Sequence, residues 1–389
     1  MKKVVIVTAY FNYDWDIRIK YLEHFFEKAN CEVQIISSNF NHRSKKIYKS
    51  GKKNLELIKV PQYKKNLSVG RMVSHVFFSK KVLEKYISIK PDIIYCITPP
   101  NFLFYFSSKY KTKYGNVKLI YEIEDLWPES LPVSDIKKRF LQLLFMIWKA
   151  IRNRYIDRAD GIVLECALYK DYLPPKLLAS IPWKVIYLSK ETNNINYSEE
   201  SPDIQSDNLR ILYLGSVNNL IDIEFIVRFM AKLNVKRTCR LVFIGGGEKT
   251  NEFLDKCRTM NVTFENYGEI YEEEEKASII QTCHFALNIM KHTVVVGATM
   301  KLLEYAANGI PIVNNIAGDT VDIIENYKCG YNVLYNTIDS AVKEICALDQ
   351  EQYLIIKNNT RQMYDKLFST HAFYRKFSEL YHMTDYEVR

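Results

Sequence analysis

The chain has 389 residues, of which 48% are hydrophobic and 25% charged, as in a soluble globular protein. Its length exceeds one typical hydrophobic core, so we expect two domains. No stretch approaches about eighteen uninterrupted apolar residues, and the start MKKVVIVTAYF lacks a small-residue cleavage site, so we predict neither a transmembrane helix nor a signal peptide. The eight scattered cysteines lack zinc-site spacing and fit buried thiols in a reducing cytoplasm.

The net charge of +9 is concentrated in residues 40–90, where fourteen Lys or Arg residues stand against two glutamates. Such a block indicates an anionic partner or surface, although a solvated basic face explains it equally well. We expect no nucleic-acid partner, because no nucleic-acid-binding module is recognisable.

The first elements predict a βαβ opening. Residues 3–11 are a β-branched run typical of a central strand, residues 17–29 have a helical apolar period, and residues 32–37 form the next strand. A ligand site would then lie in the loop 8–16 after the first strand. A GxGxxG fingerprint is absent, which argues against a classical dinucleotide site.

The rest of the first half continues the alternation. The patterns predict strands and helices at residues 55–60 (strand), 70–90 (helix), 92–98 (strand), 101–113 (helix), 118–124 (strand), 161–165 (strand) and 183–188 (strand). Residues 134–158 combine an apolar cluster with flanking Lys and Arg. This helix can lie in a membrane interface or pack in the core, and the basic block favours peripheral contact with anionic lipid.

Residues 189–208 are polar, contain Pro202 and read as the linker to a second domain. A second alternating set follows, with strands at 209–214, 240–244, 262–267, 285–289 and 310–313 and helices near 221–233, 300–308, 338–348, 351–368 and 372–381. This order predicts a parallel sheet with helices on both faces, and therefore an α/β fold. Glycine turns follow two of these strands, at Gly215 and at residues 245–247.

The segment GATMKLLEYAANGIPIV, residues 297–313, contains a complete helix signature. Thr299 is a good N-cap, Gly309 suits the left-handed position after a helix, and Pro311 prevents continuation. Lys301 and Glu304 stand three residues apart on one face near the amino end. A helix N-terminus beside a lysine suits a diphosphate, and Glu304 could accept hydrogen bonds from ribose hydroxyls. The alternative is an ordinary capped helix with a solvated Lys–Glu pair.

A second chemical candidate is the segment EDLWPES, residues 124–130, directly after a predicted strand. Carboxylates at the carboxyl end of a parallel strand point into the ligand crevice of such folds. Asp125 is therefore a candidate for contact with a ligand in that crevice. The alternative is that Asp125 and Glu129 only shape a turn.

TMKLLEYAANGIPIV resembles the donor-site segment of the retaining, nucleotide-sugar-dependent glycosyltransferases of family 4. EDLWPES resembles a loop of family members that build bacterial surface polysaccharides, in the group related to the N-acetylfucosamine transferase type. The resemblance implies a GT-B fold, with two facing Rossmann-like doubly wound domains and an active site in the interdomain cleft. The first domain would span 1–188 with a returning helix at about 370–389, the linker 189–208, and the donor domain 209–369.

The resemblance also implies roles for individual residues. Lys301 and Arg18 would stabilise the leaving diphosphate, and Asp125 would contact the transferred sugar or guide the acceptor hydroxyl; a surface arginine is the alternative for Arg18. The acceptor side of the cleft would include Glu124, Trp127 and Glu129. The donor would be held by Gly215, Ser216, Gly268, Ile270, Gly297, Ala298, Thr299, Met300 and Glu304.

Two positions depart from the family pattern. Val296 stands where the family has a glutamate that touches the donor sugar, and residues 215–219 lack the basic pair often found there.

The implied reaction transfers a sugar, with a UDP-sugar as the favoured donor, to a polyprenyl-diphosphate-linked saccharide with retention. Neither a cofactor nor a metal is expected. The protein would act in capsule, O-antigen or exopolysaccharide assembly, in the cytoplasm and peripherally on the inner face of the membrane. An inactive scaffold subunit and a nucleotide-sugar 2-epimerase are the alternatives.

Overall fold

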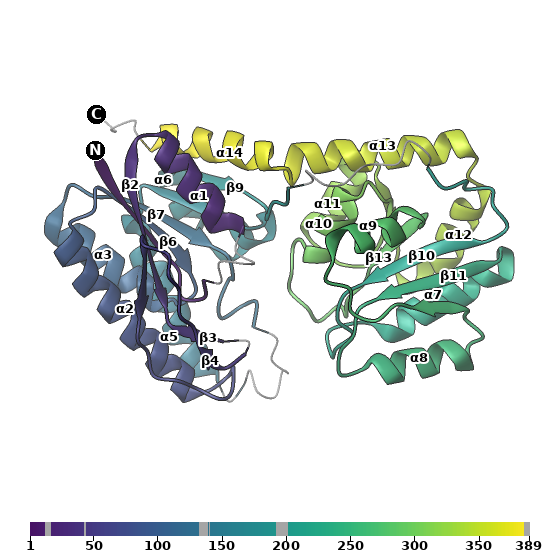
Figure 1. The fold of residues 1–389 in the computed structure, drawn as a ribbon, viewed down its shortest axis with the longest axis horizontal. Coiled ribbons are helices and arrows are strands. Elements are labelled where there is room, and N and C mark those ends of the chain that lie inside the picture. The colour runs from purple at the N-terminus through teal and green to yellow at the C-terminus, as the bar shows by residue number, and fades with distance from the viewer. Residues whose placement is uncertain (12–16, 43, 132–138, 140, 192–200, 385–389) are drawn as a thin grey trace. The chain divides into compact units, whose positions relative to one another are not determined.

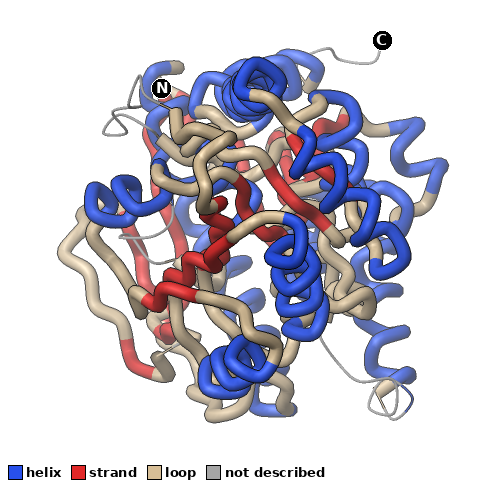
Figure 2. The backbone as a smooth tube through the Cα atoms, turned by 90° about the vertical axis from the view of Figure 1, so that its right-hand side faces the viewer, coloured by secondary structure: helices blue, strands red, loops and turns tan. Residues whose placement is uncertain are grey.

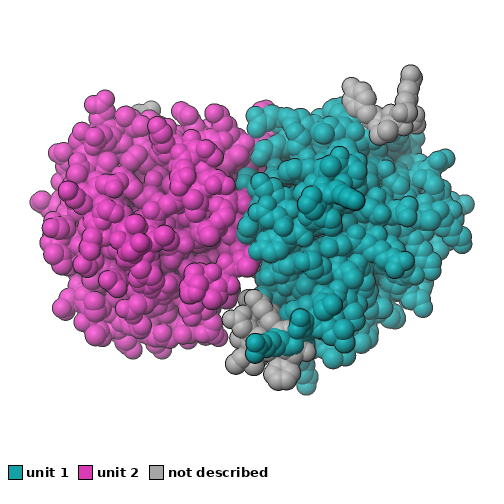
Figure 3. All heavy atoms as spheres, turned by 180° about the vertical axis from the view of Figure 1, so that it is seen from behind, with its two compact units in different colours: residues 1–187, 373–389 teal, residues 188–372 magenta. Residues whose placement is uncertain are grey.

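A computed structural model describes residues 1–11, 17–42, 44–131, 139, 141–191 and 201–384 (Figure 1). The chain forms two compact units, which Figure 3 shows in different colours. Unit 1 contains residues 1–187 and 373–389, and unit 2 contains residues 188–372. The last helix therefore contributes to the first unit.

Unit 1 contains a seven-stranded parallel sheet in its described residues, in the order β5-β2-β1-β6-β7-β8-β9. Its strands are β1 (Lys2–Val7), β2 (Cys31–Ser38), β5 (Leu55–Ile58), β6 (Ile93–Thr98), β7 (Lys118–Ile123), β8 (Gly161–Leu164) and β9 (Trp183–Val185). A short antiparallel pair, β3 (Phe40–Asn41) and β4 (Lys46–Ile47), lies outside this sheet. The order reverses between β1 and β6, which makes the unit doubly wound.

Helices pack on the sheet of unit 1 in two groups (Figure 1). The helices of unit 1 are α1 (Ile17–Lys28), α2 (Val69–Ile89), α3 (Phe102–Tyr114), α5 (Gln142–Tyr155), α6 (Pro175–Ser180) and α14 (Thr370–Met383), with 3₁₀ turns η1 (Ile156–Arg158) and η2 (Ala167–Tyr172). One group joins α2, α3 and α5. In the other, α14 packs on α1, where the Phe377 and Phe25 rings lie 4.7 Å apart. Buried side chains of both helices and of the sheet form one core.

Unit 2 repeats the design with a six-stranded parallel sheet in its described residues, ordered β12-β11-β10-β13-β14-β15. Its strands are β10 (Leu209–Leu214), β11 (Cys239–Ile244), β12 (Phe264–Asn266), β13 (Phe285–Asn288), β14 (Ile312–Asn314) and β15 (Gly330–Asn332). The strand order reverses between β10 and β13. In open α/β sheets, ligands bind outside the carboxyl ends of the strands at this switch point.

Helices surround the sheet of unit 2, as Figure 2 shows with helices in blue and strands in red. They are α7 (Ile223–Lys236), α8 (Thr250–Thr259), α9 (Glu273–Gln281), α10 (Met300–Ala307), α11 (Asp319–Tyr327), α12 (Ile338–Ala347) and α13 (Gln350–Leu367), with the 3₁₀ turn η3 (Tyr335–Thr337). α7 packs with α12, whereas α10 and α11 pack with α13. The strands between the layers are largely buried, which explains their apolar runs.

The predicted α/β class with two doubly wound units is confirmed, and local details differ. The strand predicted at 3–11 ends at Val7, so Tyr10 and Phe11 belong to the following loop. Helices α8 and α11 were not predicted. Parts of the predicted linker 189–208 are packed rather than free, because Ile204 is fully buried in the core of unit 2. Of the predicted helix 134–158, residues 134–138 and 140 lie outside the described residues. Among the helices that the structure describes, none is long and apolar enough to cross a membrane.

Candidate functional site

The start of α10 lies at the carboxyl edge of the sheet of unit 2, and α10 is the next element after β13, from which the loop 289–299 separates it. The Thr299 hydroxyl accepts a hydrogen bond from the Leu302 amide at 3.1 Å, which confirms the predicted N-cap. Gly309, with φ +65°, follows the helix, and a Cβ there would meet Arg361 at 2.8 Å. Among the hydrogen bonds of the described residues, none uses the amides of Met300 and Lys301. These amides are therefore available to an anion.

A row of asparagines holds this helix start in place. Asn288, Asn314 and Asn332 occupy aligned positions on three neighbouring strands. Asn288 donates to Asn314 at 3.1 Å, and Asn314 donates to Asn332 at 3.0 Å. Thr299 in turn donates to Asn288 Oδ1 at 2.7 Å. The Thr299 hydroxyl is thus used on both sides, as donor to the sheet and as acceptor from the helix. The sequence interpretation missed this row.

The residues before the helix are also fixed. The Gly297 carbonyl accepts hydrogen bonds from the amide and the hydroxyl of Thr320, at 3.1 and 2.7 Å. Ala298 is half-buried and Met300 is exposed. Val296 is half-buried and offers no charge.

The Gly215 loop follows β10 and lies against Lys301. A Cβ at Gly215 would meet Lys301 Cε at 3.3 Å. The two glycine turns approach each other closely, since a Cβ at Gly245, with φ +146°, would lie 2.2 Å from the Gly215 carbonyl oxygen. Only glycine fits there. Ser216 is exposed, and its carbonyl accepts from Tyr213 Oη at 3.1 Å. The structure therefore brings Gly215, Ser216 and Lys301 together.

The Lys301 amine is set in a mostly protein environment. Its Nζ donates to Tyr213 Oη at 2.8 Å and lies 4.4 Å from the centre of that ring. Burial lowers the pKa of Lys301 to about 7, because few charges compensate the lost water. Lys301 does not pair with Glu304, so the solvated surface pair is not what the structure contains.

Glu304 pairs with Lys190, from the segment predicted as a linker. Lys190 Nζ lies 2.9 and 2.8 Å from the two carboxylate oxygens of Glu304 and 2.7 Å from Glu273 at the start of α9. Burial acts to lower the pKa of Lys190, but the carboxylates of Glu304 and Glu273 raise it above its ordinary value. Each Glu304 oxygen has a further lone pair for a ligand hydroxyl. The sequence interpretation missed Lys190.

The loop after β12 contains the two remaining donor candidates. Gly268, with φ +67°, accepts a hydrogen bond from the Gly245 amide at 2.7 Å, which ties this loop to the glycine turn after β11. Ile270 is half-buried. The candidate donor residues thus all lie on loops or a helix at one edge of one sheet.

In unit 1 the EDLWPES segment follows β7, as predicted. Asp125 is exposed and Glu124 is exposed beside it. Surrounding protein nevertheless raises the pKa of the Asp125 carboxyl by desolvation, and the charge of Arg71 partly opposes this. Glu165, directly after the neighbouring strand β8, has a pKa raised well above its usual range by burial and by the charges of Glu124 and Asp125. The sequence interpretation did not single out Glu165.

Glu129 anchors the loop. Arg152 Nη1 and Nη2 donate to its carboxylate at 2.8 and 2.9 Å, and Lys149 lies 3.3 Å away. Burial alone would raise the pKa of Glu129, but the Arg152 hydrogen bonds lower it below its ordinary value. Arg152 Nη1 also donates to the Trp127 carbonyl at 3.2 Å. For Glu129 this placement favours the turn-shaping alternative over the predicted acceptor contact.

Arg18 is buried within unit 1. Its Nε lies 3.1 Å from the Glu122 carboxylate, and its Nη2 donates to the Ile186 and Tyr187 carbonyls at 2.7 and 3.0 Å. The guanidinium also lies 5.0 Å from the centre of the Phe373 ring. These contacts tie α1 to the sheet and to α14, and the burial of Arg18 contradicts the surface alternative. The catalytic role of Arg18 stays a prediction.

A polar cluster that the sequence interpretation missed lies beside Trp127. Arg71 Nε and Nη2 donate to Tyr10 Oη at 3.2 and 2.8 Å, and its guanidinium lies 4.3 Å from the centre of the Trp127 ring. Burial lowers the pKa of His75 to about 3, with Arg71 adding to the shift, so His75 is neutral. His75 Nε2 is hydrogen-bonded to Tyr10 Oη. In the described residues, no group of three His, Cys, Asp or Glu side chains is placed to hold a metal ion.

Comparison with known families identifies part of the chain. Residues 208–351, most of unit 2, match the family model described as Glycosyl transferases group 1. The similarity to this family thus covers less than half of the chain and lies within unit 2. The matched segment contains every candidate donor residue named above. A comparison with curated proteins finds no significant match.

Solved structures match both units of the chain. Sucrose-phosphate synthase from Thermosynechococcus elongatus has a TM-score of 0.69 at 14% identity, with 98% of each chain covered. The lipopolysaccharide outer core galactosyltransferase WaaB has a TM-score of 0.67 at 17% identity, with 98% of this chain and 99% of that chain covered. HepE from Anabaena, in complex with UDP, has a TM-score of 0.66 at 14% identity, with 97% and 99% covered. The likeness establishes the GT-B fold.

Proposed function

We propose that the protein is a glycosyltransferase that moves a sugar from a nucleotide-diphosphate donor to a hydroxyl of a glycan acceptor. The observation that carries this proposal is the start of α10, where free helix amides, Lys301 and Glu304 occur on one helix at the switch point of a parallel sheet. The amides and the lysine suit a diphosphate, and the carboxylate suits ribose hydroxyls. The family match of residues 208–351 supports this use.

The donor that we propose is a UDP-sugar. HepE, which has a similar fold, has structures in complex with UDP, with UDP and glucose, and with UDP-glucose. In this chain the base would contact the loop with Gly268 and Ile270, and the ribose would contact Glu304. The diphosphate would lie against Lys301 and the first amides of α10.

In the proposed reaction, an acceptor oxygen bonds to the anomeric carbon of the donor sugar while the bond from that carbon to the diphosphate oxygen breaks. The departing diphosphate gains negative charge, which Lys301 and the helix amides stabilise, and it takes up the acceptor proton. Asp125 orients the acceptor hydroxyl. We propose retention of configuration and no metal requirement, since the lysine and the helix supply the positive charge.

The acceptor that we propose is a polyprenyl-diphosphate-linked saccharide in the assembly of a bacterial surface polysaccharide. The basic segment 40–90 supports contact between unit 1 and an anionic membrane surface. The protein would then act at the inner face of the cell membrane. Flotation with anionic vesicles distinguishes this function from that of a nucleotide-sugar 2-epimerase, which needs no lipid acceptor.

Calorimetric titration with UDP, GDP and ADP tests the donor site. We expect UDP to bind, and Glu304→Ala to weaken binding by about 1–3 kcal/mol, because ribose hydroxyls lose their acceptor. Glu344→Ala is the matched control, since it removes an exposed glutamate of α12 in the same unit. It should leave UDP binding unchanged.

The outcomes separate the alternatives. Failure of all three nucleotides to bind at millimolar concentration would refute the transferase and favour an inactive scaffold. Tight UDP binding that Glu304→Ala leaves intact would remove Glu304 from the site. Binding of GDP or ADP in place of UDP would keep the transferase and change the donor.

A further inference from the structure

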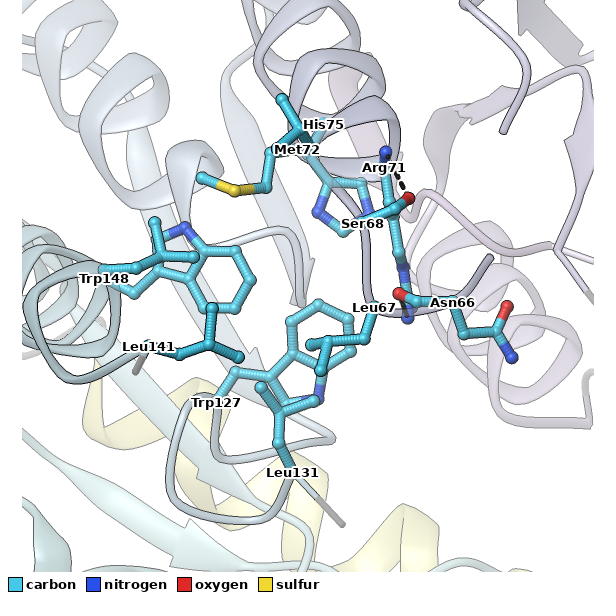
Figure 4. Close-up of a pocket in the computed structure, with 12 residues that line it drawn as sticks. Asn66, Leu67, Ser68, Arg71, Met72, His75, Trp127, Leu131, Leu141 and Trp148 are labelled. Carbon is cyan, nitrogen blue, oxygen red and sulfur yellow. Dashed lines mark hydrogen bonds between the residues drawn. The ribbon is translucent and has the colours of Figure 1, made fainter. Parts of the chain in front are cut away.

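Unit 1 contains an apolar cavity that the donor chemistry does not use. Its volume is about 240 Å³, and it lies between the start of α2, the EDLWPES loop and α5 (Figure 4). Its apolar walls include Leu67, Met72, Trp127, Leu131, Leu144 and Trp148. Water binds poorly where a cavity wall is apolar, because it finds few hydrogen-bond partners there. Such a cavity suits a hydrocarbon ligand.

The aromatic wall of the cavity is preorganised. The Trp127 and Trp148 rings stack at 5.8 Å, and Trp127 also stacks with His75 at 5.7 Å. Asn101 Nδ2 donates to the Trp127 carbonyl at 2.9 Å, and Arg152 donates to the same oxygen. These hydrogen bonds hold the backbone of Trp127, and the stacking restricts its ring, so less ordering is needed at this wall when a ligand enters.

One end of the cavity is cationic. Asn66 and Arg71 line it, and Arg71 Nη1 donates to the Asn66 carbonyl at 3.0 Å. Lys45 Nζ is hydrogen-bonded to the Asn66 side chain, so two cations share one residue at this end. Burial lowers the pKa of Lys45, and the Arg71 charge adds to the shift. Within the described residues, neither Lys45 nor Arg71 has a carboxylate within ion-pair distance. The charge of Arg71 does act on the Asp125 carboxyl, whose pKa it lowers against the effect of desolvation. An anionic group is therefore complementary to this end.

The helices that form the cavity also expose apolar side chains to solvent. On α2, Val69 is 76% and Val73 51% exposed, and on α5, Leu143 is 71% and Met146 60% exposed. Each pair is spaced by four or three residues and so lies on one helix face. Large exposed apolar residues beside basic ones are typical of helices that lie in a membrane interface.

We propose that the cavity binds the isoprenoid chain of a polyprenyl-diphosphate acceptor next to its diphosphate. The diphosphate lies at Arg71 and Lys45, the first isoprene units lie between Trp127 and Trp148, and the exposed faces of α2 and α5 contact the membrane that holds the rest of the chain. The identity of the lipid rests on the proposed function, whereas the cavity and its charged end do not. Charge at one end and hydrocarbon along the walls favour a single-chain anionic lipid.

Calorimetry with farnesyl diphosphate, farnesol and inorganic pyrophosphate tests this site on the full chain. We expect farnesyl diphosphate to bind more tightly than either part alone. Leu144→Trp fills the cavity and should weaken binding by about tenfold or more, because it displaces buried CH₂ groups of the ligand. Ala150→Trp adds an indole at an exposed position of α5 that does not line the cavity, and it should leave affinity unchanged.

A second pair of variants tests the charged end. Arg71→Met should weaken farnesyl diphosphate to near the affinity of farnesol, whereas Arg154→Met, at an exposed arginine of α5, should have no effect. Dodecyl phosphate serves as the straight-chain probe. If dodecyl phosphate binds as tightly as farnesyl diphosphate, the isoprenoid assignment is overturned in favour of an acyl lipid. If inorganic pyrophosphate binds as tightly as farnesyl diphosphate, the cavity plays no part in binding. The same conclusion follows if Leu144→Trp binds farnesyl diphosphate as tightly as the parent chain does.

UDP titration of the same preparations separates this inference from the proposed function. If Leu144→Trp still binds UDP and keeps the circular dichroism spectrum of the parent chain, the variant is folded. Its loss of affinity for farnesyl diphosphate is then due to the filled cavity. UDP binding without farnesyl diphosphate binding would refute the lipid site and leave the transferase standing. Farnesyl diphosphate binding without any nucleotide binding would refute the transferase and leave the lipid site standing.

Discussion

At the scale of single residues, Lys301 links the fold to the proposed chemistry. Its hydrogen bond to Tyr213 and its burial hold an amine of lowered pKa beside the Gly215 loop. A lysine that is half neutral at pH 7 gains a proton when an anion arrives, because a nearby negative charge favours the charged form. We therefore expect nucleotide binding to be coupled to protonation of Lys301.

This coupling predicts a pH dependence of UDP binding. Below pH 7 Lys301 is already charged in the free protein, so UDP can bind without first protonating this amine. As the pH rises above about 7, the free amine is increasingly neutral and affinity should fall by up to roughly tenfold per pH unit, until the pKa of the complex is reached. Calorimetry between pH 7.5 and 9 in two buffers of different ionisation enthalpy should report proton uptake.

Lys301→Met is the control for this effect. Above pH 7.5 the phosphates of UDP are fully ionised, so the variant should bind weakly and with little pH dependence. A parent protein whose affinity is flat from pH 7.5 to 9, without proton uptake, would show that Lys301 does not contact the diphosphate.

Sequence reasoning works at residues whose role is local and fails where partners are distant along the chain. The cap at Thr299 and the stop at Gly309 follow from their immediate neighbours. Lys190 and Glu304 are 114 residues apart, and Tyr10 and Arg71 are 61 residues apart. No spacing rule connects such pairs. For Arg18 the burial was missed for the same reason, since its partner Glu122 lies in another element.

At the scale of elements, α10 depends on one hydroxyl that joins it to the sheet. Thr299 caps the helix and also donates to Asn288, which starts the row of asparagines across β13, β14 and β15. A helix of eight residues has little stability of its own. Its position therefore depends on the cap and on burial of Leu302, Leu303 and Tyr305.

Thr299→Val should destabilise unit 2 by about 1–2 kcal/mol, because the amide of Leu302 loses its acceptor. Thr299→Ser keeps the hydroxyl and should remain close to the parent protein. Urea denaturation followed by far-UV circular dichroism measures the change, and UDP titration should show weaker binding to the valine variant alone. Equal stability of the valine and serine variants would contradict this role of the hydroxyl.

Elements with strong apolar patterns were predicted well, and those with weak patterns were missed. The buried runs of β1, β6 and β10 leave little choice of structure. α8 buries only Phe253, Leu254 and Cys257 among polar residues, so its period is faint. The alternation of strands and helices predicted a parallel sheet, but the order of its strands is not written in local sequence and was not predicted.

At the scale of the whole molecule, the end of the chain belongs to the unit in which the chain begins. Phe373, Phe377 and Leu380 of α14 are buried in the core of unit 1 together with α1. The Phe377 ring lies 5.8 Å from Phe26 and 5.6 Å from Tyr95. Unit 1 is therefore complete only when residues more than 180 positions beyond its first segment have folded onto it.

Phe377→Ala should destabilise unit 1 selectively, by about 3–5 kcal/mol, because it removes a fully buried ring from that core. The four tryptophans, at positions 15, 127, 148 and 183, all precede residue 188, so tryptophan fluorescence reports unit 1. Its unfolding midpoint in urea should fall. The proposed UDP site lies in unit 2, so UDP binding by Phe377→Ala should persist at urea concentrations that unfold its unit 1 but leave unit 1 of the parent chain native. Met383→Ala, at a residue of the same helix that is 43% exposed, should leave the midpoint unchanged. Simultaneous loss of fluorescence and UDP binding in Phe377→Ala would instead mean that the two units unfold as one.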